Sequence, residues 1–516
     1  MSVLAPCLML QGTGSGVGKS VLATALCRWF ARAGYRVAPF KSQNMALNAS
    51  VTVDGGEIGR AQAAQAEAAG IEPTVDMNPI LLKPETDHRS QVVVRGRPLA
   101  TVDFKTYRQM QPTLLPIVEQ SLGRLRQSYE LIVIEGAGSP AEINLRDGEI
   151  VNMPIARMAD AVVLLVGDID RGGVFASLLG TIELLDTEDR RRVGGFIINK
   201  FRGDASLLGP GFDVLTLRTG VPVLGVVPHF AEHLVPAEDS LDLDATAPPI
   251  APPVVDIAVV RLPRLSNFDD FEPLAREPGV RVRFARIPAE VATADAVVLP
   301  GSKSTIADLQ WLRESRVASA VCAAAGQGRT VIGICGGYQM LGNVIRDPEH
   351  VESRIDSSAG LGLLPAVTTF TRTKTTIRVQ ARVTMTAGPF ADVAGSDVTG
   401  YEIHTGRTDV QDAARPFVIV ARQGSPVREF DGAIDVTGNV VGTYLHGLFT
   451  NDALRRAFLV HLAARKGEPP DGRWGVGEAA IDRYDRLADI VAGAVDLNAV
   501  AKLVGLESRR AEGRTE

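Results

Sequence analysis

LMLQGTGSGVGKSVLATALCRWF, residues 8–30, puts a short apolar run, a glycine-rich loop and a helical pattern in direct succession. This order predicts a strand, a loop and a helix, with loop N–H groups turned toward a polyphosphate at the positive end of the helix. Lys19 can reach the terminal phosphates, and the Ser20 hydroxyl can bind Mg²⁺. The segment therefore predicts an α/β fold and a nucleotide phosphate site formed by Gly12, Thr13, Gly14, Ser15, Gly16, Val17, Gly18, Lys19 and Ser20.

The loop is one residue longer than the common phosphate-binding pattern. Thr13 stands where that pattern has a glycine, and Gly12 precedes it. A glycine-rich turn with a solvent-exposed lysine is the alternative interpretation. The following pattern favours the phosphate site, because Leu22, Leu26 and Phe30 give the predicted helix one buried face.

Apolar runs and helical patterns alternate along most of the chain. The runs are LMLQ, YRVAPF, LIVIEG, AVVLLVGDID, GGFIINK and PVLGVVP, then VVDIAVVRLP, RVRFARI, AVVLPG, TVIGICGG and NVVGTYLHGLF. Such alternation is typical of parallel sheets covered by helices. We expect two doubly wound α/β domains, over residues 1–240 and 254–465. Residues 241–253 are a proline-rich linker by composition, and residues 466–516 combine a helical pattern with a charged tail.

Composition excludes several classes of protein. The chain has 516 residues, 45% of them hydrophobic, and a formal net charge of -6. It has no excess of basic residues to bind a phosphate backbone, so we expect no nucleic-acid partner. No apolar run reaches about 18 residues and the start has no signal-peptide pattern, so we expect a cytoplasmic protein without a membrane partner. The sequence gives no signal of an oligomeric state.

Carboxylates near the predicted phosphate loop are candidate Mg²⁺ ligands. Glu135 follows the run LIVI and is expected at the carboxyl end of a strand, where ligands bind in open parallel sheets. Glu57 is a second candidate, with Asp54 three residues before it in DGGEIGRAQ. That pair fits either a metal site or the capping box of the alanine-rich helix that follows. Glu142 is a weaker candidate, with an exposed surface position as the alternative.

Polar residues also end two further runs. Asp168 and Asp170 lie in GDIDRGG, where glycines permit close ligand approach but a simple turn is equally compatible. Asn199 and Lys200 close the run GGFIINK, and Asn199 could meet a nucleobase. Polar residues without any role are also common at such strand ends.

Cys335 is the candidate nucleophile of the second half. In VIGICGGYQMLG it stands between an apolar run and a helical pattern, with small residues on both sides. Small neighbours permit a strained strand-to-helix turn, in which backbone N–H groups such as that of Gly336 face the substrate oxygen. A helix N-terminus also favours the thiolate form of a cysteine. The other cysteines lie in apolar runs without a C-x-x-C pair, which predicts inert thiols at Cys7, Cys27 and Cys322.

A thiolate nucleophile needs a base or counter-ion nearby. His446, in GTYLHGLF, ends a late run, and this strand-end position, together with its place after the nucleophile, favours it over His404, in GYEIHTG. A structural histidine is the alternative for either. The loop LPGSKST could supply a second oxyanion donor from the backbone of Gly301 or Ser302, although Ser302 could instead cap a helix.

The second half resembles the class I glutamine amidotransferases, in the branch that serves cobalamin synthesis, through LPGSKST, GICGGYQMLG and YLHGLF. The resemblance implies a flavodoxin-like fold in which Cys335 attacks the glutamine carboxamide and His446 assists. The wider class has a glutamate two residues after the histidine, where this chain has Leu448. The cobalamin branch lacks that glutamate as well, so the group that orients His446 is not identified by the resemblance.

The first half resembles the dethiobiotin synthetase-type ATPases in its longer phosphate loop. Together with PFKSQNMALN, IEGAGSP, GDIDRGGVFA and INKFRGD, the chain resembles the cobyric acid synthase family. That resemblance implies an ATP- and Mg²⁺-dependent enzyme that amidates four carboxylates of adenosylcobyrinic acid a,c-diamide, with glutamine as the nitrogen source. It also makes Lys41 a candidate substrate or metal-site residue, beside Asp54, Glu142 and Asp168.

Three other functions are compatible with the same motifs. A cobyrinic acid a,c-diamide synthase would use the same two modules on an earlier substrate. A CTP synthase-like enzyme shares this organisation, but Leu448 stands where its glutamate would fall. A partitioning-type ATP switch with an inactive amidotransferase-like binding module is the non-enzymatic alternative.

Overall fold

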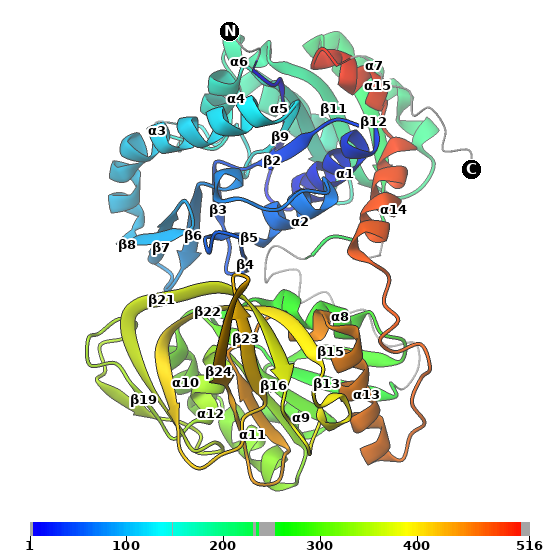
Figure 1. Ribbon diagram of the computed structural model, residues 1–516. Helices are drawn as coiled ribbons and strands as arrows, with labels where there is room; N and C mark the ends of the chain where they lie inside the picture. Colours follow the sequence, from blue (N-terminus) through cyan, green and yellow to red (C-terminus); the bar gives the residue numbers. More distant parts are fainter. Residues whose placement is uncertain (1–3, 147, 231–233, 237–252, 507–516) are drawn as a thin grey trace.

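The computed structural model describes residues 4–146, 148–230, 234–236 and 253–506, which form two α/β halves stacked on each other (Figure 1). The first half is built on a parallel six-stranded sheet of order β12-β11-β10-β1-β9-β2. Its strands are β1 (Cys7–Gly12), β2 (Val37–Phe40), β9 (Leu131–Glu135), β10 (Val162–Asp168), β11 (Val193–Phe201) and β12 (Val223–Pro228). These strands coincide with the six predicted runs of this half.

Helices cover both faces of this sheet. The apolar cluster on one face includes side chains of α3 (Phe104–Ser128), α4 (Met153–Ala159), α5 (Val174–Leu184) and α7 (Gly209–Thr219), with the short α6 (Thr187–Arg190) before β11. The cluster on the other face includes side chains of α1 (Lys19–Arg32), α14 (Ala480–Ala492) and α15 (Leu497–Leu503). The sheet is therefore doubly wound, as expected.

The last two helices return to the first half. The predicted helical pattern near residue 485 forms α14, which lies beside α1 (Figure 1). Leu487 and Val491 pack into the same cluster as Leu22 and Leu26. Residues 241–252 of the expected linker (241–253) and the charged tail (507–516) lie outside the described residues.

An insertion between β2 and α3 adds strands that the apolar runs did not predict. It contains the sheet β3 (Gln43–Met45), β6 (Ile80–Pro84), β7 (Arg89–Val94) and β8 (Arg97–Asp103), together with the hairpin β4 (Ala49–Val51) and β5 (Glu57–Gly59), and α2 (Arg60–Ala68). Asp54 lies in the turn of that hairpin and Glu57 in β5. Because α2 begins only after Gly59, the capping-box interpretation of Asp54 and Glu57 was wrong.

The second half has a six-stranded sheet of order β15-β13-β16-β18-β26-β25, parallel except at the β25 edge. Its strands are β13 (Val255–Val260), β15 (Val280–Ala285), β16 (Ala296–Leu299), β18 (Thr330–Ile334), β25 (Ala433–Ile434) and β26 (Val440–Thr443). One face carries α9 (Pro288–Ala292), α10 (Thr305–Glu314), α11 (Val317–Gly326) and α12 (Gly336–Leu341). The other face carries α8 (Glu272–Ala275) and α13 (Asp452–Lys466).

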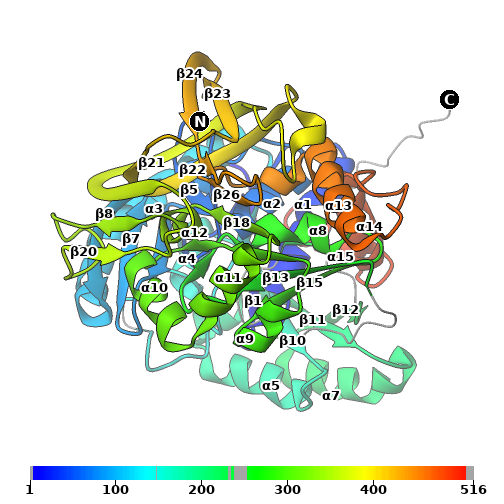
Figure 2. The same ribbon diagram turned by 90° about the horizontal axis from the view of Figure 1, so that it is seen from below.

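A second, largely antiparallel sheet completes this half. It consists of β19 (Val344–Arg346), β20 (Ser357–Ala359), β21 (Ala366–Val383), β22 (Asp397–Val410), β23 (Phe417–Arg422) and β24 (Ser425–Asp431). Val379, Ala381, Phe417 and Ile419 pack into the core beside α13. The β23–β24 hairpin stands out at one edge of the molecule in Figure 2. Among the described residues, every helix is too short or too polar to cross a membrane.

Candidate active site

The phosphate loop joins β1 to α1 in the geometry that its glycines permit. Gly16 and Gly18 have φ of 70° and 99°, a region that side chains with a Cβ rarely occupy. A Cβ on Gly18 would also lie 2.1 Å from Nδ2 of Asn199. That amide nitrogen donates a hydrogen bond to the carbonyl of Val17 (2.8 Å), so Asn199 holds the loop itself. Lys19 bridges the loop, because its Nζ donates to the carbonyl oxygens of Gly14 (2.9 Å) and Gly138 (3.0 Å).

Ser20, Glu135 and Lys41 meet beside this loop. The Ser20 hydroxyl donates to Oε1 of Glu135 (2.8 Å), and Lys41 Nζ lies 2.7 Å from the same oxygen. Gln65, from α2, donates to the other carboxylate oxygen (2.6 Å). A hydroxyl and a carboxylate side by side are hard oxygen donors, and Mg²⁺ commonly takes one or two such ligands with substrate phosphates and water. The predicted ligands Ser20 and Glu135 therefore fit a Mg²⁺ site, with Lys41 as a neighbour.

Three of the other predicted polar residues lie apart from this cluster. Asp168 ends β10 and accepts a hydrogen bond from Lys200 (2.9 Å), which also donates to the carbonyl of Gly16 (2.6 Å), so the pair supports the phosphate loop. Asp54 is exposed and accepts a hydrogen bond from Thr52. Glu142 is exposed, as its alternative interpretation held.

Glu57 is paired with two lysines at the boundary between the halves. One of its oxygens contacts Lys83 of the insertion, and the other contacts Lys374 of β21. Burial opposes ionisation of the carboxyl, but the two ammonium groups outweigh it and lower the pKa of Glu57 to about 2. Burial lowers the pKa of Lys374 to about 8 against the pull of Glu57. Both carboxylate oxygens of Glu57, a predicted Mg²⁺ ligand, thus contact lysines in this structure.

Cys335 stands at the turn between β18 and α12. Its φ of 53° and ψ of -110° are strained for a residue with a side chain, which is typical of a nucleophile held up between a strand and a helix. Gly337 makes the turn possible, because a Cβ there would lie 1.9 Å from the carbonyl oxygen of Leu299. The Cys335 side chain is 7% exposed, with Sγ 3.3 Å from the carbonyl oxygen of Ile403.

His446 lies beside Cys335 and is held by a carboxylate. Its Nδ1 is 2.6 Å from Oδ2 of Asp270, whose other oxygen accepts the backbone N–H of Gly447 (2.7 Å). Burial lowers the pKa of His446, but Asp270 and the hydrogen bond with Cys335 outweigh it and raise that pKa to about 10. Leu448, at the class glutamate position, is buried in the apolar core.

Sequence reasoning missed Asp270, although the adjacent carboxylates in NFDDF, within apolar surroundings, were a signal. His404, the rival histidine, stacks on Tyr444 with ring centroids 3.8 Å apart, and its Nε2 is 3.8 Å from a Glu402 oxygen. Those contacts hold His404 in the sheet, where it also lines the cavity at Cys335.

The backbone around Cys335 contains the predicted oxyanion residues. Gly301 and Ser302 form the short strand β17, paired with β14 (Leu265–Ser266). A Cβ on Gly336 would lie 2.9 Å from the backbone nitrogen of Ser302, so these two backbones approach closely. The Ser302 hydroxyl donates to Asp308 (2.7 Å), so its side chain is engaged in the loop. Ser302 also lines the cavity at Cys335.

The cavity at Cys335 is lined by both halves. It has a volume of about 80 Å³ and includes Gln339 and Lys374 of the second half with Lys83, Glu85 and Gln91 of the first, among other residues. Lys303, in the loop LPGSKST, forms an ion pair with Glu85 across the boundary between the halves (2.6 Å). The thiol site is therefore completed by the insertion of the first half.

The remaining cysteines lack such surroundings. Burial raises the pKa of Cys7 to about 12 and raises that of Cys27 further, while burial also raises the pKa of Cys322. A thiol with a raised pKa is a poor nucleophile at neutral pH.

Comparison with known proteins matches both halves. Residues 8–239 match the CobQ/CobB/MinD/ParA nucleotide binding domain, and residues 256–454 match the CobB/CobQ-like glutamine amidotransferase domain. Cobyric acid synthase of Sorangium cellulosum (strain So ce56) is 54% identical, covering 97% of this chain and 99% of that protein. The cobyric acid synthases of Dehalococcoides mccartyi (strain ATCC BAA-2266 / KCTC 15142 / 195) and Moorella thermoacetica (strain ATCC 39073 / JCM 9320) are each 51% identical. The two alignments cover 97% and 98% of this chain, respectively, and 98% of each relative. With about half of its residues identical to these relatives over nearly its whole length, the chain belongs to the cobyric acid synthase family of glutamine-dependent amide-forming ligases.

Proposed function

We propose that this protein amidates the b, d, e and g carboxylates of adenosylcobyrinic acid a,c-diamide, giving adenosylcobyric acid in cobalamin biosynthesis. Ammonia comes from glutamine at Cys335, and ATP bound at Lys19 activates each carboxylate. The observation that carries the proposal is the juxtaposition of Cys335, His446 and Asp270 in a cavity completed by the nucleotide-binding half.

The thiol site is suited to releasing ammonia from an amide. The raised pKa of His446 favours an imidazolium beside a Cys335 thiolate. The thiolate attacks the carboxamide carbon of glutamine, backbone N–H groups stabilise the developing oxyanion, and His446 gives its proton to the departing nitrogen. Water then hydrolyses the γ-glutamyl thioester, which releases glutamate and restores the thiolate and imidazolium. Asp270 holds the imidazole in place through both steps.

The phosphate loop is suited to activating a carboxylate. A carboxylate is a poor electrophile, so its oxygen first accepts the γ-phosphoryl group of ATP, and ammonia then displaces phosphate from the acyl phosphate. Lys19 and the loop N–H groups offset the charge of the phosphates during this transfer. Mg²⁺ held by Ser20 and Glu135 would supply further charge neutralisation at the same phosphates.

Ammonia must pass from one site to the other before it is protonated. We propose a shielded route across the boundary between the halves. The residues Lys83, Glu85 and Gln91, which line the thiol cavity, support this route because they belong to the half that binds ATP. Ammonia appearing in solvent during coupled turnover would contradict it.

The synthetase module includes a segment from the end of the chain as well as residues 1–240. We propose that residues 1–240 and 254–465 act as synthetase and glutaminase, and that the helices within 466–516 belong functionally to the synthetase, since α14 and α15 pack on α1. ATP use and a thiol that must stay reduced favour a cytoplasmic location.

Mass spectrometry of the corrinoid tests the proposal. Adenosylcobyrinic acid a,c-diamide incubated with the protein, ATP, Mg²⁺ and glutamine should undergo four successive carboxyl-to-amide conversions. Conversion of cobyrinic acid itself to a diamide, or of UTP to CTP, without these four steps would replace the proposal by one of the alternative ligase activities.

A further inference from the structure

The short segment that carries Asp270 is held by the nucleotide-binding half. Asp270 lies in the 3-10 turn Phe268–Phe271, and the three residues before it each contact the first half. Asn267 donates from Nδ2 to the carbonyl of Ala49 in β4 (2.8 Å). The backbone N–H of Phe268 donates to Oδ1 of Asn48 (3.0 Å).

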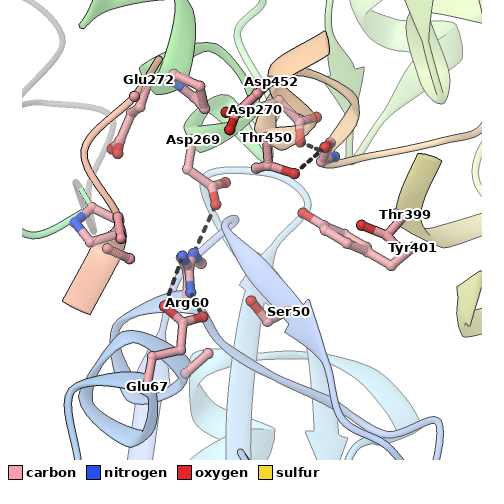
Figure 3. A pocket seen from close by; sticks show the side chains of 18 of the residues that line it. Ser50, Arg60, Glu67, Asp269, Asp270, Glu272, Thr399, Tyr401, Thr450 and Asp452 are labelled. Atoms are coloured by element: carbon pink, nitrogen blue, oxygen red, sulfur yellow. Dashed lines mark hydrogen bonds and ion pairs between the residues drawn. The ribbon is translucent and has the colours of Figure 1, made fainter. Parts of the chain in front are cut away.

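The third contact is an ion pair. Nε of Arg60, the first residue of α2, lies 2.9 Å from Oδ2 of Asp269, and Nη1 of the same guanidinium lies 2.8 Å from Glu67 (Figure 3). Burial raises the pKa of Asp269 to about 7, and Arg60 opposes that rise. Arg60 therefore favours the charged form of a carboxylate that would otherwise tend to take up a proton in its buried position.

His446 is also restrained through Tyr401. The two residues exchange backbone hydrogen bonds, and their rings stack with centroids 5.3 Å apart. The Tyr401 hydroxyl accepts a hydrogen bond from Asn267 (3.0 Å). The segment held by the first half thus restrains the imidazole in two ways. Asp270 contacts its Nδ1, and Tyr401 stacks on one face of its ring.

We propose that Arg60 and Asn48 of the nucleotide-binding half are positioning residues for the glutaminase triad and act through the segment Asn267–Asp270. The imidazole can protonate the departing nitrogen only while Asp270 keeps its orientation. A small displacement of a catalytic group costs roughly 10- to 100-fold in rate. Glutamine hydrolysis in the second half therefore requires contacts made by the first half.

Helix α2 extends this dependence toward the phosphate loop. Arg60 is its first residue, and Gln65, one turn further along, donates to Glu135 beside Ser20. One nine-residue helix thus contacts both the cluster that receives ATP and the segment that holds the triad.

The test separates the two reactions and rests on the proposed function. Arg60→Gln, Asp269→Asn and the double variant are compared in the full chain, with glutamate release measured without corrinoid and amidation measured with added ammonium. We expect the glutamine-hydrolysis kcat to fall roughly 10- to 100-fold in each single variant, with the KM for glutamine and the ammonium-driven rate unchanged. The double variant should be no worse than either single one, because both changes remove the same contact.

Glu72→Gln is the matched control. It removes an ion pair to Arg378 (2.8 Å) that also joins the two halves but does not contact Asn267–Asp270, and it should leave glutamine hydrolysis at the wild-type rate. An unchanged kcat in Arg60→Gln, a change in KM alone, or an equal loss of ammonium-driven amidation would each overturn the positioning role. If the wild-type protein released glutamate but did not amidate the corrinoid, the proposed substrate would be contradicted. The glutamate-release rates of the Arg60→Gln and wild-type proteins would still test the positioning role.

Discussion

The carboxylate that holds His446 comes from a distant part of the chain. Asp270 lies 176 residues before the histidine, in the 3-10 turn Phe268–Phe271, whereas Leu448, two residues after the histidine, packs into the core. A group that orients an imidazole needs only the right position and charge, so it can be supplied from any neighbouring element.

Asp270→Asn tests this residue directly. The carboxylate raises the pKa of His446 to about 10, so its loss should let burial lower that pKa and leave the imidazole neutral around pH 7. A neutral imidazole is too weak an acid to protonate the departing nitrogen readily, and we expect glutamine hydrolysis to fall by roughly 10²- to 10⁴-fold. The rate of glutamate release as a function of pH measures this loss, and the rate of ammonium-driven amidation is the control. Hydrolysis at the wild-type rate with an unshifted pH profile would contradict the role of Asp270.

The buried pair of Glu57 with two lysines makes a prediction about stability. Glu57→Gln leaves Lys83 and Lys374 buried without a counter-charge, and breaking such a pair costs about 3–5 kcal/mol. Denaturant unfolding measures the loss. Because the pKa of Glu57 is lowered to about 2, its contribution is present above the ordinary carboxyl pKa and is lost as pH falls through about 2. The exposed pair Arg382–Asp397 supplies a control, since Asp397→Asn should leave unfolding unchanged.

At the scale of elements, α14 completes the core of the first half although it lies at the far end of the chain. Its buried residues pack on α1, and Arg28 of α1 makes two hydrogen bonds of 2.8 Å to Asp485 of α14. An amphipathic pattern shows which face of a helix is buried, but several apolar surfaces could cover that face. The sequence therefore predicted the helix, but only the tertiary structure shows that it packs on α1.

Leu487→Ala should destabilise the first half. Leu487 is fully buried, and truncating a buried leucine to alanine costs about 2–5 kcal/mol. We expect a lower Tm together with loss of ammonium-driven amidation at a temperature that the wild type tolerates. Leu217→Ala, at a position 87% exposed on α7, is the control and should change neither. Equal Tm values for the two variants would mean that α14 contributes nothing to this core.

At the scale of the whole molecule, two chemically separate sites share one chain. The phosphate loop and the thiol turn each follow a parallel strand, but they belong to different sheets joined across the insertion β3–β8. In the proposed mechanism ammonia connects the two sites, so a variant that inactivates one site should leave the reaction at the other intact.

A reciprocal pair of variants tests this separation. Cys335→Ser should abolish glutamine-driven amidation and leave ammonium-driven amidation intact, because a serine hydroxyl lacks the thiolate. Lys19→Ala should lower amidation from either nitrogen source by roughly 10²- to 10³-fold and leave glutamate release unchanged. Steady-state rates with glutamine and with ammonium measure both. Loss of both activities in the cysteine variant would show that the sites are not independent.

The sequence by itself determined the repeating strands and the phosphate loop, and it predicted the two candidate reactive side chains, Cys335 and His446. Each of these depends on local order: apolar runs long enough to cross a sheet, glycines at the loop, and small residues around Cys335. Only the tertiary structure decided the partners. Asp270 reaches His446, Lys83 and Lys374 enclose Glu57, and α14 returns to α1, because charges and apolar faces pair with whatever the folded chain brings within a few ångströms, at any separation in sequence. The strands β19–β24 of the largely antiparallel sheet were also missed, since the alternating and partly exposed pattern of its long strands gives no continuous apolar run to find.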